Sequence, residues 1–240
     1  MGSVEIPPDQ PWAWKPGMHT GLRFPFPGAQ SLTTNHSQAW QDIFVLSILE
    51  GLRHGSYLEI GANAPFHNNN TALLSRDFAW TGVSVEFDPS FVVPWLTERS
   101  DDLLVIADAL AIDYHRALPL WFGTELKRVD YLQLDIDPSL NTLEALRRLP
   151  LDAVRFSVIT FETDAYAGDP RARDESREIL SGYGYELVGP DVNVLFPPLA
   201  AHPIPFEDWW VDPEVVDPDR IRQLRSLTLS PLMPQSILFG

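Results

Sequence analysis

The run Tyr57-Leu58-Glu59-Ile60-Gly61-Ala62-Asn63-Ala64 is a short apolar strand that passes into a glycine turn. Gly61 lets the backbone approach a ligand at a place where a Cβ atom would clash. The turn holds only one glycine, so the dinucleotide fingerprint G-x-G-x-x-G is absent. This absence argues against a nicotinamide cofactor.

Further strands and helices alternate along the chain on either side of this run. Short apolar stretches predict strands at 82–86, 103–107, 131–134 and 156–161. A helix is expected over 39–49 with Ser37 as its N-cap, and a later one near 142–149 with Asn141 and Glu144 as a capping box. Two more are expected over 171–180, after the cap Asp169 and Pro170, and near 219–227. Apolar strands separated by helices predict an α/β fold, a Rossmann-like, mostly parallel sheet with helices on both faces.

The pattern changes after Gly184. Two apolar stretches, 185–188 and 192–196, are separated by Gly-Pro-Asp, which predicts an antiparallel hairpin at the edge of the sheet. Residues 1–36 are rich in proline and aromatic residues and are expected to form an irregular arm packed on the body, with a disordered tail as the alternative. Residues 37–240 are expected to be one domain. Its segment from about 197, with Glu207-Asp208-Trp209-Trp210, would be lid-like, and core packing is the competing explanation for both tryptophans.

Composition limits the partners of the chain. Seventeen Lys and Arg stand against 33 Asp and Glu, a net charge of −16, which would repel a phosphate backbone and disfavours nucleic acid. With no cysteine, disulfides and thiolate metal sites are excluded. No stretch has the features of a secretory signal or a membrane span, so we expect a cytoplasmic protein with no membrane partner and a small-molecule substrate.

Acidic residues follow each of the five predicted parallel strands, where a doubly wound sheet binds its ligands. One such acid is commonly a turn former or a helix cap, but five in succession predict a ligand site. Glu86 suits a bidentate grip on ribose hydroxyls, and Asp108 can accept from an adenine amine. Asn70 is a natural cap for the next helix, whose N-terminus would face a ligand carboxylate. The acids at the strand ends are Glu59, Glu86, Asp108, Asp135 with Asp137, and Glu162 with Asp164.

At these residues the sequence resembles the FkbM-type family of class I S-adenosylmethionine-dependent methyltransferases. The resemblance runs from about residue 37 to 210 and rests on the stretches 37–42, 59–63, 68–71, 80–86, 130–135 and 206–210. It implies a parallel sheet that ends in an antiparallel hairpin, and S-adenosylmethionine as cofactor. Many relatives have Asp-x-Glu-Gly where this chain has Asp-Ile-Asp-Pro at 135–138. The cofactor residues that the resemblance and the strand ends together imply are Glu59, Gly61, Ala62 and Asn63 for the methionine part, Asn70 beside it, Glu86 for the ribose, Asp108 and Ala109 for the adenine, and Asp135.

Two catalytic designs fit this set of residues. In the first, Asp135 and Glu162 bind a divalent cation such as Mg²⁺, with Asp137 or Asp164 completing the shell. In the second, His67, His115 or one of the carboxylates is the base. The function expected is O-methyl transfer to a hydroxyl of a sugar or secondary metabolite, as in natural-product biosynthesis. A nicotinamide-dependent enzyme and a non-catalytic S-adenosylmethionine-binding module are the alternatives.

Overall fold

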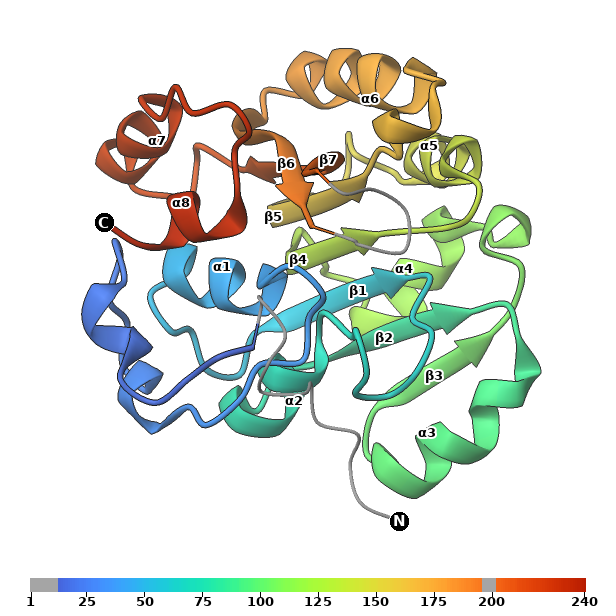
Figure 1. The fold of residues 1–240 in the computed structure, drawn as a ribbon. Helices are drawn as coiled ribbons and strands as arrows, with labels where there is room; N and C mark the ends of the chain where they lie inside the picture. The colour runs from blue at the N-terminus through green and yellow to red at the C-terminus, as the bar shows by residue number, and fades with distance from the viewer. Residues whose placement is uncertain (1–12, 196–201) are drawn as a thin grey trace.

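A computed structural model describes residues 13–195 and 202–240, which form a seven-stranded sheet in the order β3-β2-β1-β4-β5-β7-β6 (Figure 1). Strands β1 to β5 pair in parallel, and β7 is antiparallel to both β5 and β6. Because β1 has β2 on one side and β4 on the other, the chain reverses direction across the sheet there. The strands are β1 Ser56–Ile60, β2 Thr81–Glu86, β3 Leu103–Ile106, β4 Arg128–Leu134, β5 Arg155–Glu162, β6 Glu186–Val194 and β7 Ile204–Val211.

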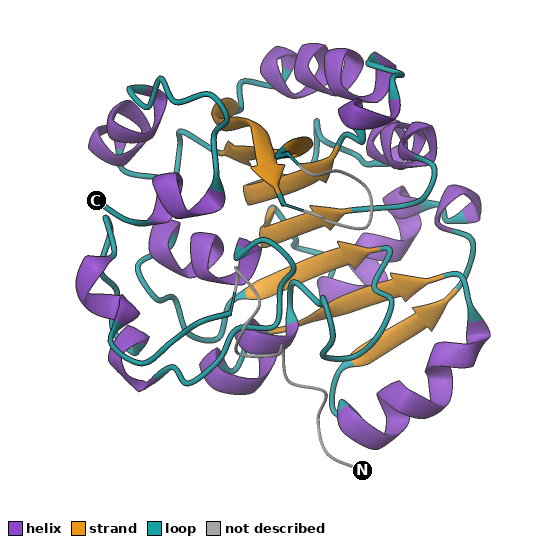
Figure 2. Ribbon diagram, in the orientation of Figure 1, coloured by secondary structure: helices purple, strands orange, loops and turns teal. Residues whose placement is uncertain are grey.

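Helices cover both faces of the sheet, as predicted (Figure 2). One face packs against α1 Gln41–Ile48, α2 Ala72–Phe78, α7 Pro218–Arg225 and α8 Pro234–Leu238. The opposite face packs against α4 Tyr114–Phe122, α5 Ser139–Arg148 and α6 Arg171–Gly182, and α3 Val92–Glu98 lies beside β3. The side chains of β4 show the division, since Tyr131 belongs to the first core and Leu132 to the second. The predicted Rossmann-like fold of mostly parallel strands is therefore confirmed.

The antiparallel hairpin predicted at the edge of the sheet is present, but other residues form it. Residues 186–194 form the single strand β6, and the Gly-Pro-Asp stretch is accommodated in it as an irregularity of register. Its antiparallel partner is β7, more distant in the chain, and β7 lies between β5 and β6. Gly-Pro-Asp is a turn signal only in isolation, and here pairing with β7 on one side overrides it. Phe196, the expected end of the hairpin, is outside the described residues.

The sequence Glu207-Asp208-Trp209-Trp210 is an interior strand segment rather than a lid. Both tryptophan side chains are fully buried, Trp209 in the core beneath α1 and Trp210 in the core on the opposite face. Successive side chains of a strand point to opposite faces, so an interior strand buries both. Core packing therefore explains both tryptophans. Residues 196–201 of the expected lid-like segment are outside the described residues.

The predicted helices form, but several begin at other residues. Helix α1 begins at Gln41 rather than 39, and its N-cap residue is Trp40. Ser37 donates to the Asp42 side chain and accepts only a long 3.4 Å bond from the Asp42 amide. Helix α5 begins at Ser139, so Asn141 lies inside its first turn and no capping box forms. Asp169 does accept a hydrogen bond from the Arg171 amide at the start of α6. The first residue of a helix depends on which nearby side chains bind its free backbone amides, and apolar periodicity does not show this.

The described part of the N-terminal arm is irregular apart from two short 3₁₀ helices, η1 Met18–Gly21 and η2 Ala29–Ser31. Trp14, Phe24 and Phe26 are buried against α1, α2 and α8 within the first core. Arg23 donates hydrogen bonds to three backbone carbonyls of residues 236–239 and ties the arm to the C-terminal helix. In the described chain no helix is both long and apolar enough to cross a membrane.

Candidate active site

A cavity of about 610 Å³ opens at the carboxyl ends of β1, β2 and β4 and the loop after β3, where the chain reverses direction across the sheet. Glu162 at the end of β5 completes one wall. The structure brings together nearly all the residues that the sequence predicted for the site: Glu59, Gly61, Ala62, Asn63, Asn70, Glu86, Asp108, Ala109, Asp135, Asp137 and Glu162. The remaining walls come from Gln38, Asn68, Val85, Phe87, Ala107, Leu110, Gln133, Ile136 and Asn141.

Gly61 is required by a protein contact rather than by a ligand. Its φ is +88°, and a Cβ built on it would lie 1.6 Å from the Asp135 carbonyl oxygen. The turn after β1 thus crosses directly against the chain leaving β4. Gly61 still lines the cavity, but the reason for a glycine there differs from the one that the sequence suggested.

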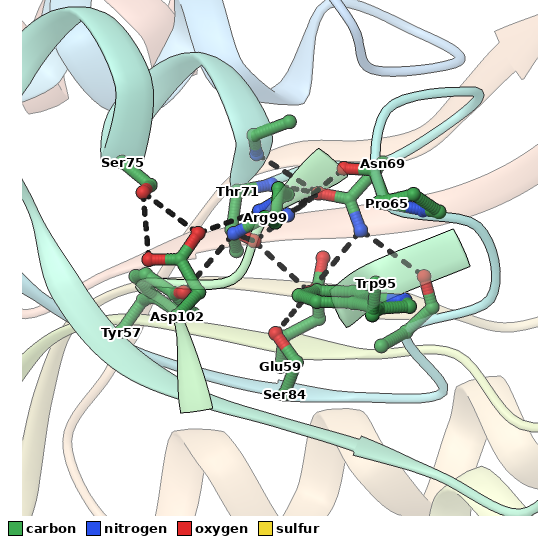
Figure 3. A network of polar contacts seen from close by, with 12 residues as sticks. Tyr57, Glu59, Pro65, Asn69, Thr71, Ser75, Ser84, Trp95, Arg99 and Asp102 are labelled. Atoms are coloured by element: carbon green, nitrogen blue, oxygen red, sulfur yellow. Dashed lines mark hydrogen bonds and ion pairs between the residues drawn. The ribbon is translucent and has the colours of Figure 1, made fainter. Parts of the chain in front are cut away.

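Glu59 is a buried carboxylate whose two oxygens have different surroundings (Figure 3). Ser84, Thr71 and Asn69 all donate to Oε2, at 2.7, 2.9 and 3.3 Å. No described residue donates to Oε1, and Glu59 lines the cavity. Burial raises the pKa of Glu59, and the nearby Arg99 guanidinium and these donors oppose that rise. One oxygen is therefore fixed by the protein and the other is left to accept from a ligand.

Arg99, which the sequence analysis missed, organises the loop between β1 and α2 (Figure 3). The side chain is buried, stacks on the Trp95 ring and pairs with Asp102 at 2.6 Å. It also donates to the Pro65 carbonyl at 3.1 Å and to Asn69 Oδ1 at 2.8 Å. A lone arginine at the end of a short helix carries no pattern, so only the fold reveals this role.

Asn69 and Asn70 exchange the roles expected of them. Asn69 Oδ1 accepts from the backbone amides of Thr71 and Ala72 and so caps α2, which was the role predicted for Asn70. Asn70 is buried and lines the cavity, and its Oδ1 has no hydrogen-bond donor among the described residues. The two adjacent asparagines have equal capping propensity, so only the geometry of the loop decides which of them caps the helix.

Glu86 and Asp108 stand at the ends of β2 and β3 with their carboxylates held by backbone amides. Glu86 Oε2 accepts from the Asn63 amide at 2.7 Å, and Oε1 accepts from the Asp88 amide at 2.8 Å. Asp108 Oδ1 accepts from the Leu110 amide at 2.8 Å. Carboxylate oxygens have further lone pairs, so both groups are positioned and keep capacity to bind hydroxyl or amine donors.

Asp135, at the end of β4, is one of a group of carboxyl groups that face one another. The residue is partly exposed, but its carboxyl group is desolvated, and burial raises its pKa to about 7 with help from Asp137, Asp164, Glu59 and Glu86. Glu207, paired across strands with Glu162, is buried nearby, and burial raises its pKa to about 8 although Trp209 donates to it. Glu207 therefore lies in the interior strand β7 and not in the lid-like segment expected from the sequence.

The metal design does not fit the described residues. They contain no group of three Asp, Glu or His side chains arranged to hold a metal ion, so Asp135, Asp137 and Glu162 do not converge as ligands. The strand ends bring these residues to one cavity, but their carboxylate oxygens are not close enough together to bind one ion. His67 and His115 are both exposed and neither lines the cavity.

Comparison with known proteins finds no matching family model and no matching curated protein. Several solved structures are similar to part of the chain. An rRNA methylase from Streptococcus thermophilus is 15% identical, with 71% of this chain and 93% of that chain covered and a TM-score of 0.42. A TehB-like SAM-dependent methyltransferase from Corynebacterium glutamicum is also 15% identical, with 77% and 91% covered and a TM-score of 0.43.

A fibrillarin from Aeropyrum pernix, solved with natively bound S-adenosyl-L-methionine, is 16% identical, with 67% of each chain covered and a TM-score of 0.41. Similarities at this level of identity and TM-score carry no conclusion about the activity of this chain. The assignment rests on the strand order, with β7 antiparallel between β5 and β6. The chain has the Rossmann-like fold of class I methyltransferases.

Proposed function

We propose that this protein is an S-adenosylmethionine-dependent methyltransferase that transfers a methyl group to a hydroxyl of a small molecule, such as a sugar or secondary metabolite. One observation carries the proposal: acids from β1, β2, the loop after β3, and β4 line a single cavity in the order in which a nucleoside with an amino-acid tail would meet them. Membership of the FkbM-type family is part of the proposal and rests on the sequence stretches quoted above.

The side chains present fit this cofactor. Asn70 Oδ1 is a buried acceptor without a donor, and Glu59 keeps one oxygen free, so together they would hold the methionine ammonium group. Glu86 would accept from the ribose hydroxyls, and Asp108 from the adenine amine. Phe87 and Leu110 give that end of the cavity apolar walls.

When bound, S-adenosylmethionine supplies an electrophilic methyl group, which bonds to the acceptor oxygen as the carbon–sulfur bond breaks and its electron pair stays on sulfur. The protein then has to align the acceptor and accept its proton. Asp135 suits the second task because it lines the cavity and its pKa of about 7 lets it take up a proton near neutral pH.

Calorimetric titration with S-adenosylhomocysteine, with NAD as the control ligand, tests the proposal. We expect micromolar binding of S-adenosylhomocysteine and no heat from NAD. Tight NAD binding would favour a nicotinamide enzyme instead. Binding of S-adenosylhomocysteine without transfer of labelled methyl to any hydroxylated compound would favour a non-catalytic module.

A further inference from the structure

We infer that the methyl acceptor is a small molecule that carries a protonated amine, recognised by the side of the cavity formed by Gln133, Asp135, Asp137 and Glu162. The inference rests on the proposed function, since it concerns the acceptor side of the same cavity. It follows from the charge of the cavity and from an unsatisfied acceptor within it.

The cavity is anionic and contains no compensating cation. Six residues that line it are acidic, and none of its described lining residues is Lys, Arg or His. None of the six forms an ion pair with a described cationic side chain, as the ion pairs of the protein all lie elsewhere. The six are Glu59, Glu86, Asp108, Asp135, Asp137 and Glu162.

Elsewhere the fold neutralises two fully buried acids with arginine, while a third, Asp42, is held by backbone amides and a hydroxyl instead. Arg177 pairs with Asp208 at 2.7 Å, and Arg155 pairs with Asp212 at 2.8 Å.

In the cavity only Asp135 is comparably desolvated, whereas Asp137 is exposed and Glu162 partly exposed. The cost of leaving the charges of the cavity unmatched therefore comes mainly from their repulsion of one another. The absence of arginine from the cavity therefore points to a cationic ligand as the missing partner.

The cofactor uses only part of this negative charge. Glu59, Glu86 and Asp108 lie at the ends of β1, β2 and β3 and would serve the methionine, ribose and adenine parts. S-adenosylmethionine carries a sulfonium, an ammonium and a carboxylate, a net charge of only +1. Asp135, Asp137 and Glu162 remain on the other side of the cavity without a partner.

An unpaired buried acceptor on the same side supports a ligand that donates hydrogen bonds. Gln133 lines the cavity, is 3% exposed, and its buried Oε1 has no donor among the described residues. It precedes Asp135 by two positions on β4, so the two side chains share a face of the sheet. An ammonium group has three donors and no acceptor, which matches Gln133 Oε1 and the two outer carboxylates.

Other acceptor classes fit this chemistry less well. A phosphate or carboxylate on the acceptor would meet like charges without an intervening cation, which is unfavourable at short range. A neutral polyol would satisfy Gln133 but would leave the carboxylates uncompensated. Nucleic acid combines the phosphate difficulty with a protein of net charge −16.

Calorimetric titration of the protein saturated with S-adenosylhomocysteine tests the inference with matched compounds. The set at pH 7.5 is 2-aminocyclohexanol, cyclohexane-1,2-diol and 2-hydroxycyclohexanecarboxylate, together with glucosamine, glucose and glucuronate. We expect each amine to bind at least tenfold more tightly than its neutral counterpart, and the acids not to bind. A single-stranded RNA oligonucleotide completes the set and is expected not to bind.

Charge-removing variants localise the effect. Asp137→Asn and Glu162→Gln should each reduce the preference for amines to less than threefold. Asp152→Asn removes the same charge from an exposed position outside the cavity and should leave the preference intact.

Equal binding of amines and diols, binding of the acids or the RNA, or no binding of any amine at 10 mM would each overturn the inference. In all these cases binding of S-adenosylhomocysteine leaves the proposed function standing. Failure of S-adenosylhomocysteine itself to bind would instead overturn the proposed function.

Discussion

Asp212 and Asp135 are carboxyl groups of the same kind whose surroundings shift their pKa values in opposite directions. Arg155 and Arg128 donate to Asp212 and lower its pKa despite burial. Asp135 has no such donor and faces other carboxylates, so its pKa rises. The first arrangement holds strands together, and the second leaves a group ready to exchange a proton.

Replacing Glu86 tests the position assigned to the ribose. Glu86→Ala should weaken binding of S-adenosylhomocysteine by about 1–3 kcal/mol, because charge-assisted hydrogen bonds to the ribose are lost. Titration calorimetry measures the change. Glu98→Ala removes an exposed acid from the end of α3 and should leave the affinity unaltered. Unchanged affinity in a folded Glu86→Ala protein would show that the ribose lies elsewhere.

Replacing Asp135 tests the proposed base. In the wild-type protein, kcat should rise with pH through about 7 and then level off, because only the deprotonated carboxylate accepts a proton. Asp135→Asn should lower kcat by roughly 10²- to 10⁴-fold and remove this pH dependence. Steady-state kinetics between pH 5.5 and 9 give both results. A variant that retains the wild-type profile would assign the titration to another group.

Two segments depend on single residues for their placement around the cavity. The turn after β1 crosses the end of β4 at Gly61, and the loop from Ala62 to Thr71 is held by Arg99. Neither contact is local in sequence. Both contacts position residues that line the cavity.

The crossing at Gly61 can be tested by adding one methyl group. Gly61→Ala should lower the free energy of unfolding by at least about 2 kcal/mol, since overpacking adds to the cost of a positive φ. Gly184→Ala is the matched control, because its φ is +80° and nothing lies within 4 Å of the added Cβ. Urea unfolding of both proteins separates the packing cost from the conformational one. Equal losses would contradict the close contact with the Asp135 carbonyl.

The anchoring of the loop can be tested at Arg99. Arg99→Met should lower the free energy of unfolding by about 3–5 kcal/mol, because it leaves Asp102 without its buried partner. It should also weaken binding of S-adenosylhomocysteine, as Asn69 and Pro65 lose a donor. Arg116→Met breaks an exposed pair with Asp113 and should change stability by no more than about 0.5 kcal/mol. A stable Arg99→Met protein with full affinity would remove Arg99 from this role.

Over the whole molecule, negative charge is distributed unevenly with respect to arginine. In the part of the chain that the structure describes, arginines pair with Asp208 in β7, with Asp212 just after it and with Asp102 before β3. The described acids of the cavity and Glu207 behind it form no ion pair with a described cationic side chain. The active-site region therefore lowers the stability of the fold at neutral pH, a common consequence of concentrating like charges for function.

This distribution predicts how stability depends on pH. The folded pKa values of Asp135 and Glu207, about 7 and about 8, lie above their ordinary values of 3.8 and 4.5. At pH values between the ordinary and the folded pKa of each group, the folded protein binds more protons than the unfolded chain. The free energy of unfolding should therefore fall as pH rises from about 5 to 8. Urea unfolding across this range measures the slope. Glu207→Gln should flatten it, Glu98→Gln should not, and a stability that rises over the range would contradict the assignment.

The fold class was predictable because strand periodicity and strand ends are local properties of the sequence. The five parallel strands fall where apolar runs predicted them, and their terminal acids meet in one cavity because parallel strands end at the same edge. The position of β7 was not predictable, since Gly-Pro-Asp is a turn signal that long-range pairing overrides. Among the described residues, the expected metal ligands do not converge on one point and the two histidines do not line the cavity, because nearness in strand order does not fix where side-chain atoms point.

By itself, the sequence determined the α/β alternation and the set of acids at the strand ends, through patterns that span a few residues. Only the tertiary structure decided which atoms of those acids are held and which are left free. Gly61 is required by its contact with Asp135, and Arg99 holds Pro65 and Asn69, which are distant from it in the chain. Charge compensation also depends on distance in space, so only the folded chain shows that arginine neutralises Asp208 and Asp212 and is absent from the cavity.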